Sequence, residues 1–323
     1  MTQSRQAVLR AAAAPLQVGV REIPVPAGEQ VLVRVLATGV CRTDLHLASG
    51  TDAIALPRVL GHEVAGWVDG LGAVLVYGAF GCGACESCAI GDEQLCPEVA
   101  FLGRTADGGF ADHVLVPSLR HCVPLGDLEP TLAAPLADAG LTAYRAVTRA
   151  LPWMRTGGSV LVIGAGGLGS FAVQLLCELT GAAILVCEID PSRLAHALAS
   201  GPGRARAWTE RDRGADVVLD FVGSASTLEQ ATASVRIGGV IVVIGSEHGP
   251  ERLRVALRPE VTVVHSIWGS LPELVALVAL AGDGGLRLST EVLPLEAVNE
   301  ALERLAQGRA SQRIVLAPPV TDA

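Results

Sequence analysis

A glycine-rich hexapeptide narrows the possible folds of this chain more than any other segment. It spans residues 164–169 and reads Gly-Ala-Gly-Gly-Leu-Gly, which fits the pattern G-x-G-x-x-G. An apolar run at 160–163 precedes it, and apolar residues at helical spacing follow at 168–179. In such a strand–turn–helix unit, the glycines permit a tight turn and let backbone N–H groups approach a pyrophosphate at the positive helix end. The expected cofactor contacts in this loop are Gly164, Gly166, Gly167, Leu168 and Gly169.

A carboxylate further along the chain strengthens this interpretation, because the hexapeptide alone is a weak signal in a chain with 37 glycines. A second apolar run, 184–187, ends in Glu188, which lies 19 residues beyond Gly169. A carboxylate there accepts hydrogen bonds from the adenosine ribose and repels a 2′-phosphate, so NAD is expected rather than NADP. Arg193 is included among the expected cofactor contacts. The alternative is an ordinary glycine-rich turn with a surface glutamate.

From about residue 159 the chain alternates between strand-like and helix-like patterns. Buried strands are expected at 216–221 and 240–244, with a helix at 226–235 between them. Strands that alternate with helices indicate a parallel sheet covered on both faces. The stretch 190–216 is short, so we expect a reduced helix there and a more open adenine pocket.

The first 140 residues have a β-rich pattern instead. Short apolar runs such as 30–36 and 64–68 are separated by Gly, Pro and Asp, which favour turns. The runs 64–68 and 73–77 flank a glycine-containing turn and predict a hairpin. Towards the C-terminus we expect two amphipathic helices and a final strand, at 271–281, 295–307 and 313–317.

Four of the eight cysteines form a cluster at Cys82, Cys85, Cys88 and Cys96. Their short spacings let one loop wrap a single tetrahedral zinc ion, and in a reducing compartment such a cluster indicates a metal site rather than disulfides. A site closed by four thiolates is structural, because it leaves no open position for a substrate. An iron–sulfur cluster, which also uses four cysteines, and unpaired thiols are the alternatives.

A second possible metal site comes from two other segments. These are Cys41-Arg-Thr-Asp-Leu-His46 and Gly61-His-Glu63. A cysteine and a histidine from different loops could bind a zinc ion that stays open to a substrate. Each residue taken alone is uninformative, since a single cysteine is usually part of the packed interior.

The ordered set of segments resembles the zinc-containing medium-chain alcohol dehydrogenase family, and the resemblance covers nearly the whole chain. It runs from Cys41 through Gly61-His62-Glu63, the cysteine cluster and the segment 133–144 to the glycine loop. It implies an NAD-linked, zinc-dependent oxidoreductase that transfers a hydride between an alcohol and NAD and forms an aldehyde or ketone. Two zinc ions per chain and a homodimer or homotetramer are also implied.

The implied fold class is α/β, with a GroES-like β-rich catalytic domain and a doubly wound Rossmann domain. The catalytic domain is expected at 1–138 and 268–323, with the structural zinc lobe at 81–97. The dinucleotide-binding domain is expected at 139–267.

The resemblance also implies roles around the catalytic zinc. Cys41, His62 and Asp138 are its implied ligands, and Asp138 stands where many members have a second cysteine and others an aspartate. This donor set leaves a fourth position for an alcohol, whose hydroxyl pKa a Lewis-acidic zinc lowers. Thr43 and His46 match the family's proton relay from the substrate hydroxyl to solvent.

Four further residues match supporting positions of the family. Asp44 matches a carboxylate that orients His62 through its distal ring N–H. Glu63 matches a residue that can approach the metal when water or substrate exchanges. Arg42 and Arg313 match positions that pair with the cofactor pyrophosphate. The simpler interpretations are that Thr43 caps a helix and that His46 is a surface imidazole.

The sequence departs from the family near the expected substrate pocket. Cys82 follows Glu63 by only nineteen positions, which is a shorter interval than the family usually has and affects the rim of the pocket. Gly78 stands where some relatives have a bulky aromatic residue, although the nearby Phe80 could refill part of the space. If it does not, the pocket is wider and suits a bulky or secondary alcohol. Candidates for the remaining wall are Leu47, Trp67 and Trp268.

Composition excludes several functional classes. The net charge of −9 argues against a nucleic-acid partner. All 24 permanently cationic side chains are arginine, and the absence of lysine excludes a Walker-type phosphate loop and Schiff-base catalysis. No apolar run reaches the roughly 18 residues that span a bilayer, and the N-terminus lacks the three-part signal-peptide pattern. We therefore expect a cytoplasmic protein with a small-molecule alcohol or carbonyl partner and no membrane partner.

Two alternative functions stay open. The first is a biosynthetic carbonyl or imine reductase that uses NADH or NADPH, since the sequence does not set the direction of the reaction. The second is a non-catalytic relative that keeps the fold and binds the cofactor. Retention of Cys41, His62, Asp138, Thr43 and His46 argues against the second, because a binding protein has no use for an open zinc site.

Overall fold

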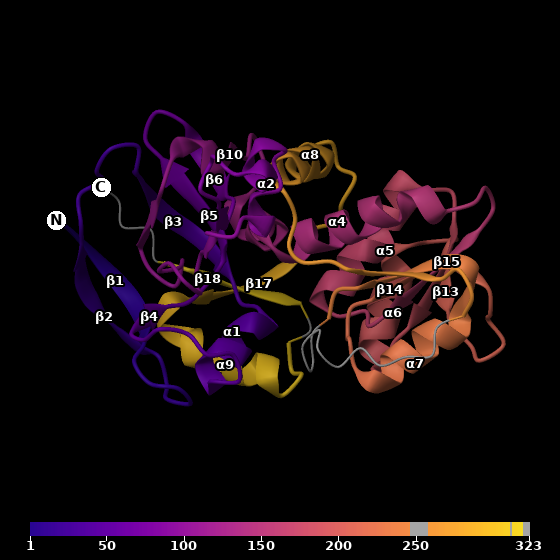
Figure 1. Cartoon of the computed structure of the whole chain (residues 1–323). Helices are drawn as coiled ribbons and strands as arrows, with labels where there is room; N and C mark the ends of the chain where they lie inside the picture. Colours follow the sequence, from indigo (N-terminus) through magenta and orange to yellow (C-terminus); the bar gives the residue numbers. More distant parts are fainter. Residues whose placement is uncertain (246–257, 311, 319–323) are drawn as a thin grey trace. The chain divides into compact units, whose positions relative to one another are not determined.

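The computed structural model describes residues 1–245, 258–310 and 312–318, and the chain divides into two compact units (Figure 1). Unit 1 comprises Met1–Ala139, Ser270–Asp283 and Leu288–Ala323, and unit 2 comprises Gly140–Gly269 and Gly284–Arg287. Within the described part of the chain, every helix is too short or too polar to span a lipid bilayer.

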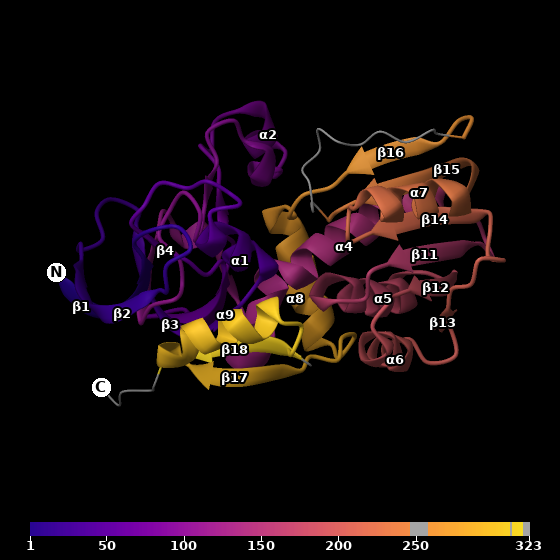
Figure 2. The same ribbon diagram turned by 90° about the horizontal axis from the view of Figure 1, so that it is seen from below.

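Unit 2 is built on a six-stranded parallel sheet in the order β13-β12-β11-β14-β15-β16, which can be followed in Figure 2. Its strands are β11 (Ser159–Ile163), β12 (Ala183–Cys187), β13 (Ala205–Ala207), β14 (Ala215–Asp220), β15 (Val235–Val243) and β16 (Thr262–His265). The strand order reverses beside β11, because β12 and β13 lie on one side of it and β14 on the other. Open α/β sheets bind ligands at the carboxyl ends of the strands beside such a reversal. The predicted Rossmann arrangement is therefore confirmed.

The helices of this part of the chain follow the strands in alternation. They are α4 (Ala139–Ala150), α5 (Gly167–Leu179), α6 (Pro191–Ser200) and α7 (Ala225–Ser234). Helix α7 corresponds to the helix predicted at 226–235 and begins after Ser224, whose hydroxyl accepts the Thr227 N–H at 3.2 Å. Helices α6 and α7 both have 10 residues. The short stretch 190–216 thus keeps its helix, and its short element is the 3-residue β13.

Unit 1 contains three mainly antiparallel sheets. Their orders are β2-β1-β4, then β10-β6-β5-β3-β18-β17 with β9 also pairing with β3, and β7-β8. The first strands are β1 (Thr2–Leu9), β2 (Gln17–Ile23), β3 (Val31–Gly39), β4 (Arg58–Val59), β5 (Glu63–Val68) and β6 (Gly72–Val76). The later ones are β7 (Ala79–Phe80), β8 (Ala100–Phe101), β9 (His113–Val116), β10 (Cys122–Pro124), β17 (Thr290–Pro294) and β18 (Arg313–Ala317). Strands β5 and β6 pair antiparallel, which confirms the predicted hairpin.

The helices of unit 1 are short, and α1 and α9 pack against its strands. They are α1 (Arg42–Ser49), α2 (Glu86–Ala89), α3 (Pro130–Ala133), α8 (Leu271–Gly282) and α9 (Val298–Ala306). The helix predicted at 295–307 begins as a 3₁₀ turn, Leu295–Ala297, and continues as α9. One buried cluster joins β1, α1, α9 and β18, and a second joins β3, β5, β6, β9 and β10. Residues of β3, α1 and β5, the elements that flank Cys41 and His62, pack in these two cores.

Arginine supplies the cation of the strongest ion pairs in both units. In unit 1, Arg5 contacts Asp112 at 2.8 Å and Glu296 at 2.9 Å. In unit 2, the buried carboxylate of Asp216 accepts Arg155 at 2.5 Å and Arg236 at 2.6 Å. Because a guanidinium carries five N–H donors in a planar fork, one side chain can tie together segments that are distant in sequence.

Close packing at the glycine loop leads to a prediction about stability. A Cβ on Gly169 would lie 1.9 Å from the Gly164 carbonyl oxygen, whereas a Cβ on Gly166 would meet nothing within 4 Å. We expect Gly169→Ala to destabilise unit 2 by about 1–3 kcal/mol, as overpacking does elsewhere. Gly166→Ala, measured beside it by thermal unfolding, should leave stability close to that of the wild type. Equal melting temperatures for the two variants would contradict this packing argument.

Candidate metal centres and dinucleotide loop

The three predicted ligands of the catalytic metal lie together in unit 1. Cys41 precedes α1, His62 precedes β5, and Asp138 follows the 3₁₀ turn Ala134–Ala137. Their ligand atoms all lie within 4.8 Å of one another, and all three side chains are buried. Three segments that are distant in sequence thus bring a thiol, an imidazole and a carboxylate to one point.

The distances within this group fit one tetrahedral ion. Asp138 Oδ2 lies 3.6 Å from Cys41 Sγ and 3.3 Å from His62 Nε2. Around one tetrahedral zinc, Zn–S is about 2.3 Å and Zn–N or Zn–O is about 2.0 Å. A sulfur and an oxygen ligand are then about 3.5 Å apart, and a nitrogen and an oxygen ligand are about 3.3 Å apart. Burial lowers the pKa of His62, but Asp44 and Asp138 outweigh it and raise that pKa well above its usual value. The spacing and the chemistry of the three donors, a thiol, an imidazole and a carboxylate, fit zinc.

Asp44 connects the two loops that carry Cys41 and His62. Its Oδ2 accepts the Cys41 N–H at 2.8 Å, and its Oδ1 accepts the Gly61 N–H at 3.2 Å. The same Oδ1 lies 3.5 Å from His62 Nδ1. The carboxylate is fully buried. The expected orienting role of Asp44 stays a prediction, and the two backbone contacts are ones that no sequence pattern indicated.

Glu63 lies in a buried ion pair beside the same group. Its Oε2 accepts Arg313 Nε at 3.0 Å, its Oε1 contacts Arg313 Nη2, and Oε1 also accepts the Ala139 N–H at 3.1 Å. A Cβ on Gly39 would lie 1.8 Å from Oε2, so this position of β3 requires glycine. Burial raises the pKa of Glu63, and Arg313 opposes that rise without cancelling it. Glu63 thus fixes the backbone next to Asp138.

The expected relay and phosphate contacts are placed on α1 and β18. Thr43 and His46 are half-buried, and Thr43 Oγ1 lies 3.8 Å from Cys41 Sγ. Residues three apart on a helix are neighbours on one face, so Thr43 and His46 lie on the same side of α1, and their relay stays a prediction. Arg42 is exposed on the first turn of α1. Arg313 contacts Glu63 within unit 1, and its expected contact with a pyrophosphate stays a prediction.

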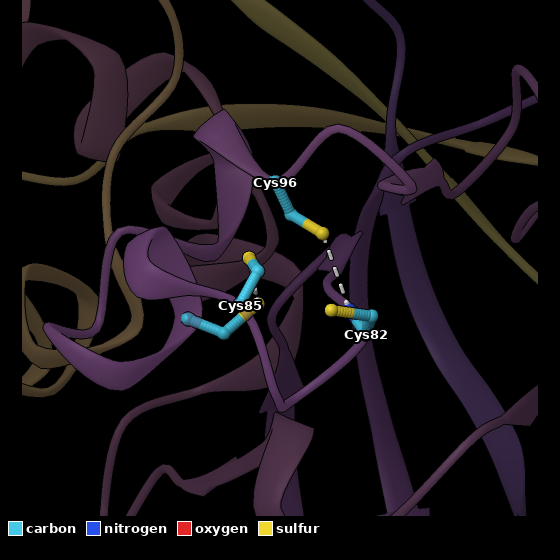
Figure 3. A group of neighbouring side chains, drawn as sticks. Cys82, Cys85 and Cys96 are labelled. Carbon is cyan, nitrogen blue, oxygen red and sulfur yellow. Dashed lines mark hydrogen bonds between the residues drawn. The ribbon is translucent and has the colours of Figure 1, made fainter.

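The four clustered cysteines form a second group of donors in unit 1. All four sulfur atoms lie within 4.8 Å of one another, and Figure 3 shows Cys82, Cys85 and Cys96 with their sulfurs turned towards a common point. Cys85 Sγ is 3.5 Å from Cys88 Sγ, close to the spacing of about 3.8 Å around a tetrahedral zinc. The N–H groups of Ala84 and Cys85 lower the pKa of Cys82 to about 7, which favours the thiolate that binds metal.

A buried carboxylate, which no sequence pattern indicated, supports this lobe. Glu93 accepts the Gly81 N–H at 3.0 Å and contacts Arg120 and, at 3.4 Å, His121 Nε2. A Cβ on Gly81 would lie 2.6 Å from Cys88 Sγ, so the chain enters the lobe through a glycine. The ring of His121 in turn stacks on Tyr77. The lobe is thereby fixed to β6 and to the segment before β10.

The glycine loop lies at the carboxyl end of β11 in unit 2. Gly164 has φ of +83°, a left-handed conformation that favours glycine, and Gly166 caps α5 with open space at its Cβ position. Glu188 follows β12, and its carboxylate accepts three backbone N–H groups, from Ala165 at 2.8 Å, Ile189 at 2.8 Å and Asp190 at 3.0 Å. An open helix N-terminus beside a left-handed glycine fits a bound pyrophosphate.

Comparisons with known families identify the chain. Residues 27–127 match the family described as "Alcohol dehydrogenase GroES-like domain", and residues 167–283 match the one described as "Zinc-binding dehydrogenase". The chain belongs to the zinc-containing medium-chain alcohol dehydrogenase family. Membership in this family makes it a zinc-dependent oxidoreductase and confirms the GroES-like and Rossmann fold class.

Individual relatives match over nearly the full length. D-arabinose 1-dehydrogenase (NADP(+)) of Saccharolobus solfataricus is 33% identical over 98% of this chain and 99% of its own. An NAD-dependent alcohol dehydrogenase of Sulfolobus acidocaldarius is 33% identical over 94% and 96%. The crystal structure of the alcohol dehydrogenase from Aeropyrum pernix has a TM-score of 0.89 and 33% identity, covering 97% of this chain and 100% of that one.

The Glu63–Arg313 pair leads to a prediction about stability. Arg313→Met leaves the fully buried Glu63 carboxylate without its cation, which should cost about 3–5 kcal/mol. Adding Glu63→Gln should recover part of that loss, because the uncompensated charge is gone. Arg304→Met, which breaks a pair with the partly exposed Glu291, should cost less than about 1 kcal/mol. Urea unfolding measures all three, and similar losses for Arg313→Met and Arg304→Met would refute the buried-charge argument.

Proposed function

We propose that this protein catalyses the NAD-linked interconversion of a bulky or secondary alcohol with its aldehyde or ketone. One observation carries the proposal: Cys41, His62 and Asp138 converge with spacings that fit one tetrahedral zinc ion. Three protein ligands leave a fourth position open, which is the arrangement of a catalytic zinc rather than a structural one. NAD and zinc are its cofactors, and small alcohols or carbonyl compounds are its substrates.

A zinc ion held by these residues supplies Lewis-acid chemistry, which lowers the pKa of an alcohol hydroxyl. The chain's own residues then handle the proton and the geometry. Thr43 accepts the proton of the substrate hydroxyl, and His46 passes it to solvent. Asp44 keeps His62 in one tautomer and also holds the Cys41 N–H, so both ligands keep one orientation. NAD, held at the glycine loop of unit 2, would supply the acceptor for the hydride of the carbinol carbon.

For the cofactor, we assign the pyrophosphate to the glycine loop at the start of α5 and the adenosine ribose to Glu188. The carboxylate supports this role because a negative charge at the end of β12 disfavours a 2′-phosphate. Arg193 on α6, together with Arg42 and Arg313, completes the proposed cofactor contacts. Unit 2 then serves as the dinucleotide-binding domain and unit 1 as the catalytic domain, with Cys82, Cys85, Cys88 and Cys96 as ligands of a structural zinc.

The packing of Phe80 supports a wide substrate pocket. Its side chain is buried, and its ring lies edge-on to His121 with centroids 5.0 Å apart. Phe80 therefore packs in a core cluster of unit 1, and we propose that it does not take the place of the aromatic residue that some relatives have at Gly78. Leu47 also packs in a core cluster, whereas Trp67 is 40% exposed.

We further propose a homodimer or homotetramer in the cytoplasm. Strand β16 is the last strand in the described order of the sheet, and the apolar Ile267, 45% exposed, follows it. Edge strands with apolar neighbours favour association with another chain. All eight cysteines lie in the described part of the chain and none is in a disulfide, which fits a reducing compartment.

The metal assignments lead to a first test by elemental analysis. The wild type should contain two zinc ions per chain, and Cys41→Ser should contain one, lose turnover and still bind NAD. Cys177→Ser, which changes a half-buried thiol outside both groups, is the control and should keep both ions. A wild type with one zinc per chain favours the non-catalytic alternative, and undiminished turnover by Cys41→Ser would refute the catalytic zinc.

The pocket assignment leads to a second test, in which steady-state kinetics compare a panel of alcohols and carbonyl compounds. We expect kcat/KM for bulky or secondary alcohols to exceed that for ethanol by about tenfold or more, since each extra methylene in an apolar pocket is worth that much. NAD should be preferred over NADP. If ethanol is the best substrate, the proposal of a wide pocket is wrong. A clear preference for NADPH with carbonyl substrates would favour the reductase alternative.

A further inference from the structure

A second carboxylate beside the glycine loop has no role in the proposed reaction. Asp220 is the last residue of β14 and is fully buried. Its Oδ1 accepts the N–H groups of Val222 at 2.9 Å and Gly223 at 3.0 Å, and its Oδ2 accepts the Thr227 hydroxyl at 2.8 Å. All three donors are neutral groups of the turn and helix that follow the strand. The carboxylate therefore fixes the turn 221–224 from within.

This turn packs directly against the glycine loop. Strands β11 and β14 are neighbours, and the Phe221 N–H continues their pairing by donating to the Ile163 carbonyl at 2.9 Å. A Cβ on Gly164 would lie 2.7 Å from Val222 Cγ2 and a Cβ on Gly169 would lie 3.6 Å from Phe221 Cδ2. The turn 221–224 thus packs against Gly164, which has a left-handed backbone conformation.

On its other side, the turn 221–224 packs against the backbone of Gly245, which follows β15. The Gly245 N–H donates to the Asp220 carbonyl at 3.1 Å. A Cβ on Gly223 would lie 2.0 Å from the Gly245 carbonyl oxygen, so the two backbones touch. The turn is held between the ends of β11 and β15, and its conformation is set by Asp220.

Two carboxylates hold the glycine loop from opposite sides. Glu188, at the end of β12, accepts the Ala165 N–H, and Asp220, at the end of β14, fixes the turn beside Gly164. Glu188 is half-buried and can also face a ribose, whereas Asp220 is fully buried and can act only through the turn. We infer that Asp220 is a positioning residue for the dinucleotide, because it sets the direction of the loop's N–H groups. This inference rests on the proposed function of unit 2.

The test compares two buried carboxylates on the same strand. Asp220→Ala removes the acceptor at the carboxyl end of β14, and Asp216→Ala removes the one near its amino end, which holds Arg155 and Arg236. Both variants destabilise the sheet, but only the first releases the turn beside the glycine loop. NADH binding is measured by fluorescence titration on folded, zinc-loaded protein, with near-UV circular dichroism as the check on folding.

We expect Asp220→Ala to raise the Kd for NADH and the KM for NAD by about tenfold, with a smaller change in kcat at saturating NAD, because misplaced binding groups weaken binding strongly. Asp216→Ala should bind NADH like the wild type. Asp220→Asn should also stay close to the wild type, because its carbonyl oxygen accepts the same two N–H groups and its NH₂ can donate to Thr227. A purely structural role predicts equal effects for both alanine variants.

An unchanged Kd in Asp220→Ala, or an equal loss in Asp216→Ala, would overturn the inference. If Asp220→Ala does not fold, Thr227→Val is the second test, because it removes one of the three donors to the Asp220 carboxylate. Thr227→Val should weaken NADH binding moderately, and an unchanged Kd for NADH again counts against the inference. The wild type separates this result from the larger proposal. A wild type that binds no NADH defeats the proposed function of unit 2 and this inference together, whereas tight binding that is insensitive to Asp220 defeats the inference alone.

Discussion

Buried carboxylates that accept backbone N–H groups determine the shape of both candidate sites. A carboxylate removed from water must be given donors, and a hydrogen bond to a charged acceptor is about twice as strong as one between neutral groups. In this chain many of those donors belong to the peptide backbone of functional loops. The buried residues that act in this way are Asp44, Glu63, Glu93 and Asp220, and the half-buried Glu188 does the same. Each therefore fixes a segment that carries a predicted ligand or cofactor contact or, for Asp220, the turn packed against one.

The same arrangement explains why the donor atoms of the metal groups are already close together. Asp44 accepts the backbone N–H of Cys41 and that of the residue before His62. Glu63 accepts the backbone N–H of the residue after Asp138. A site whose ligands are held in place loses little conformational freedom when an ion binds. Removing one of these carboxylates would leave a buried N–H group unpaired, which costs about 1–3 kcal/mol in addition to the lost orientation.

Local patterns in the sequence predicted much of this structure. The glycine loop, the alternation of strands and helices, and the cysteine cluster are all encoded within short segments, and each is found where it was expected. The hairpin β1–β2 was not predicted, and β2 is exposed along nearly its whole length, so it lacks the buried apolar face by which a strand is recognised. Helices α1 and α4 were also missed.

Contacts between distant residues were beyond local patterns. Arg313 and Glu63 are 250 positions apart, and the glycine that makes room for their contact, Gly39, belongs to another strand. The convergence of Cys41, His62 and Asp138 was predicted only through resemblance to a family, since spacing alone cannot bring residues from three segments together. Asp220 gave no signal because a carboxylate at the end of a strand is common, and its function depends on what packs against the turn.

The arginine-only ion pairs of this chain have a chemical consequence for an enzyme that handles carbonyl compounds. Aldehydes condense with uncharged primary amines to form imines, and lysine side chains are the usual targets. Guanidinium groups stay protonated at any physiological pH and are held here by carboxylates such as Asp112 and Asp216. Since the chain contains no lysine, its side chains offer no primary amine to the product. Aldehydes therefore find no side chain in this protein with which to form the imines that damage lysine residues.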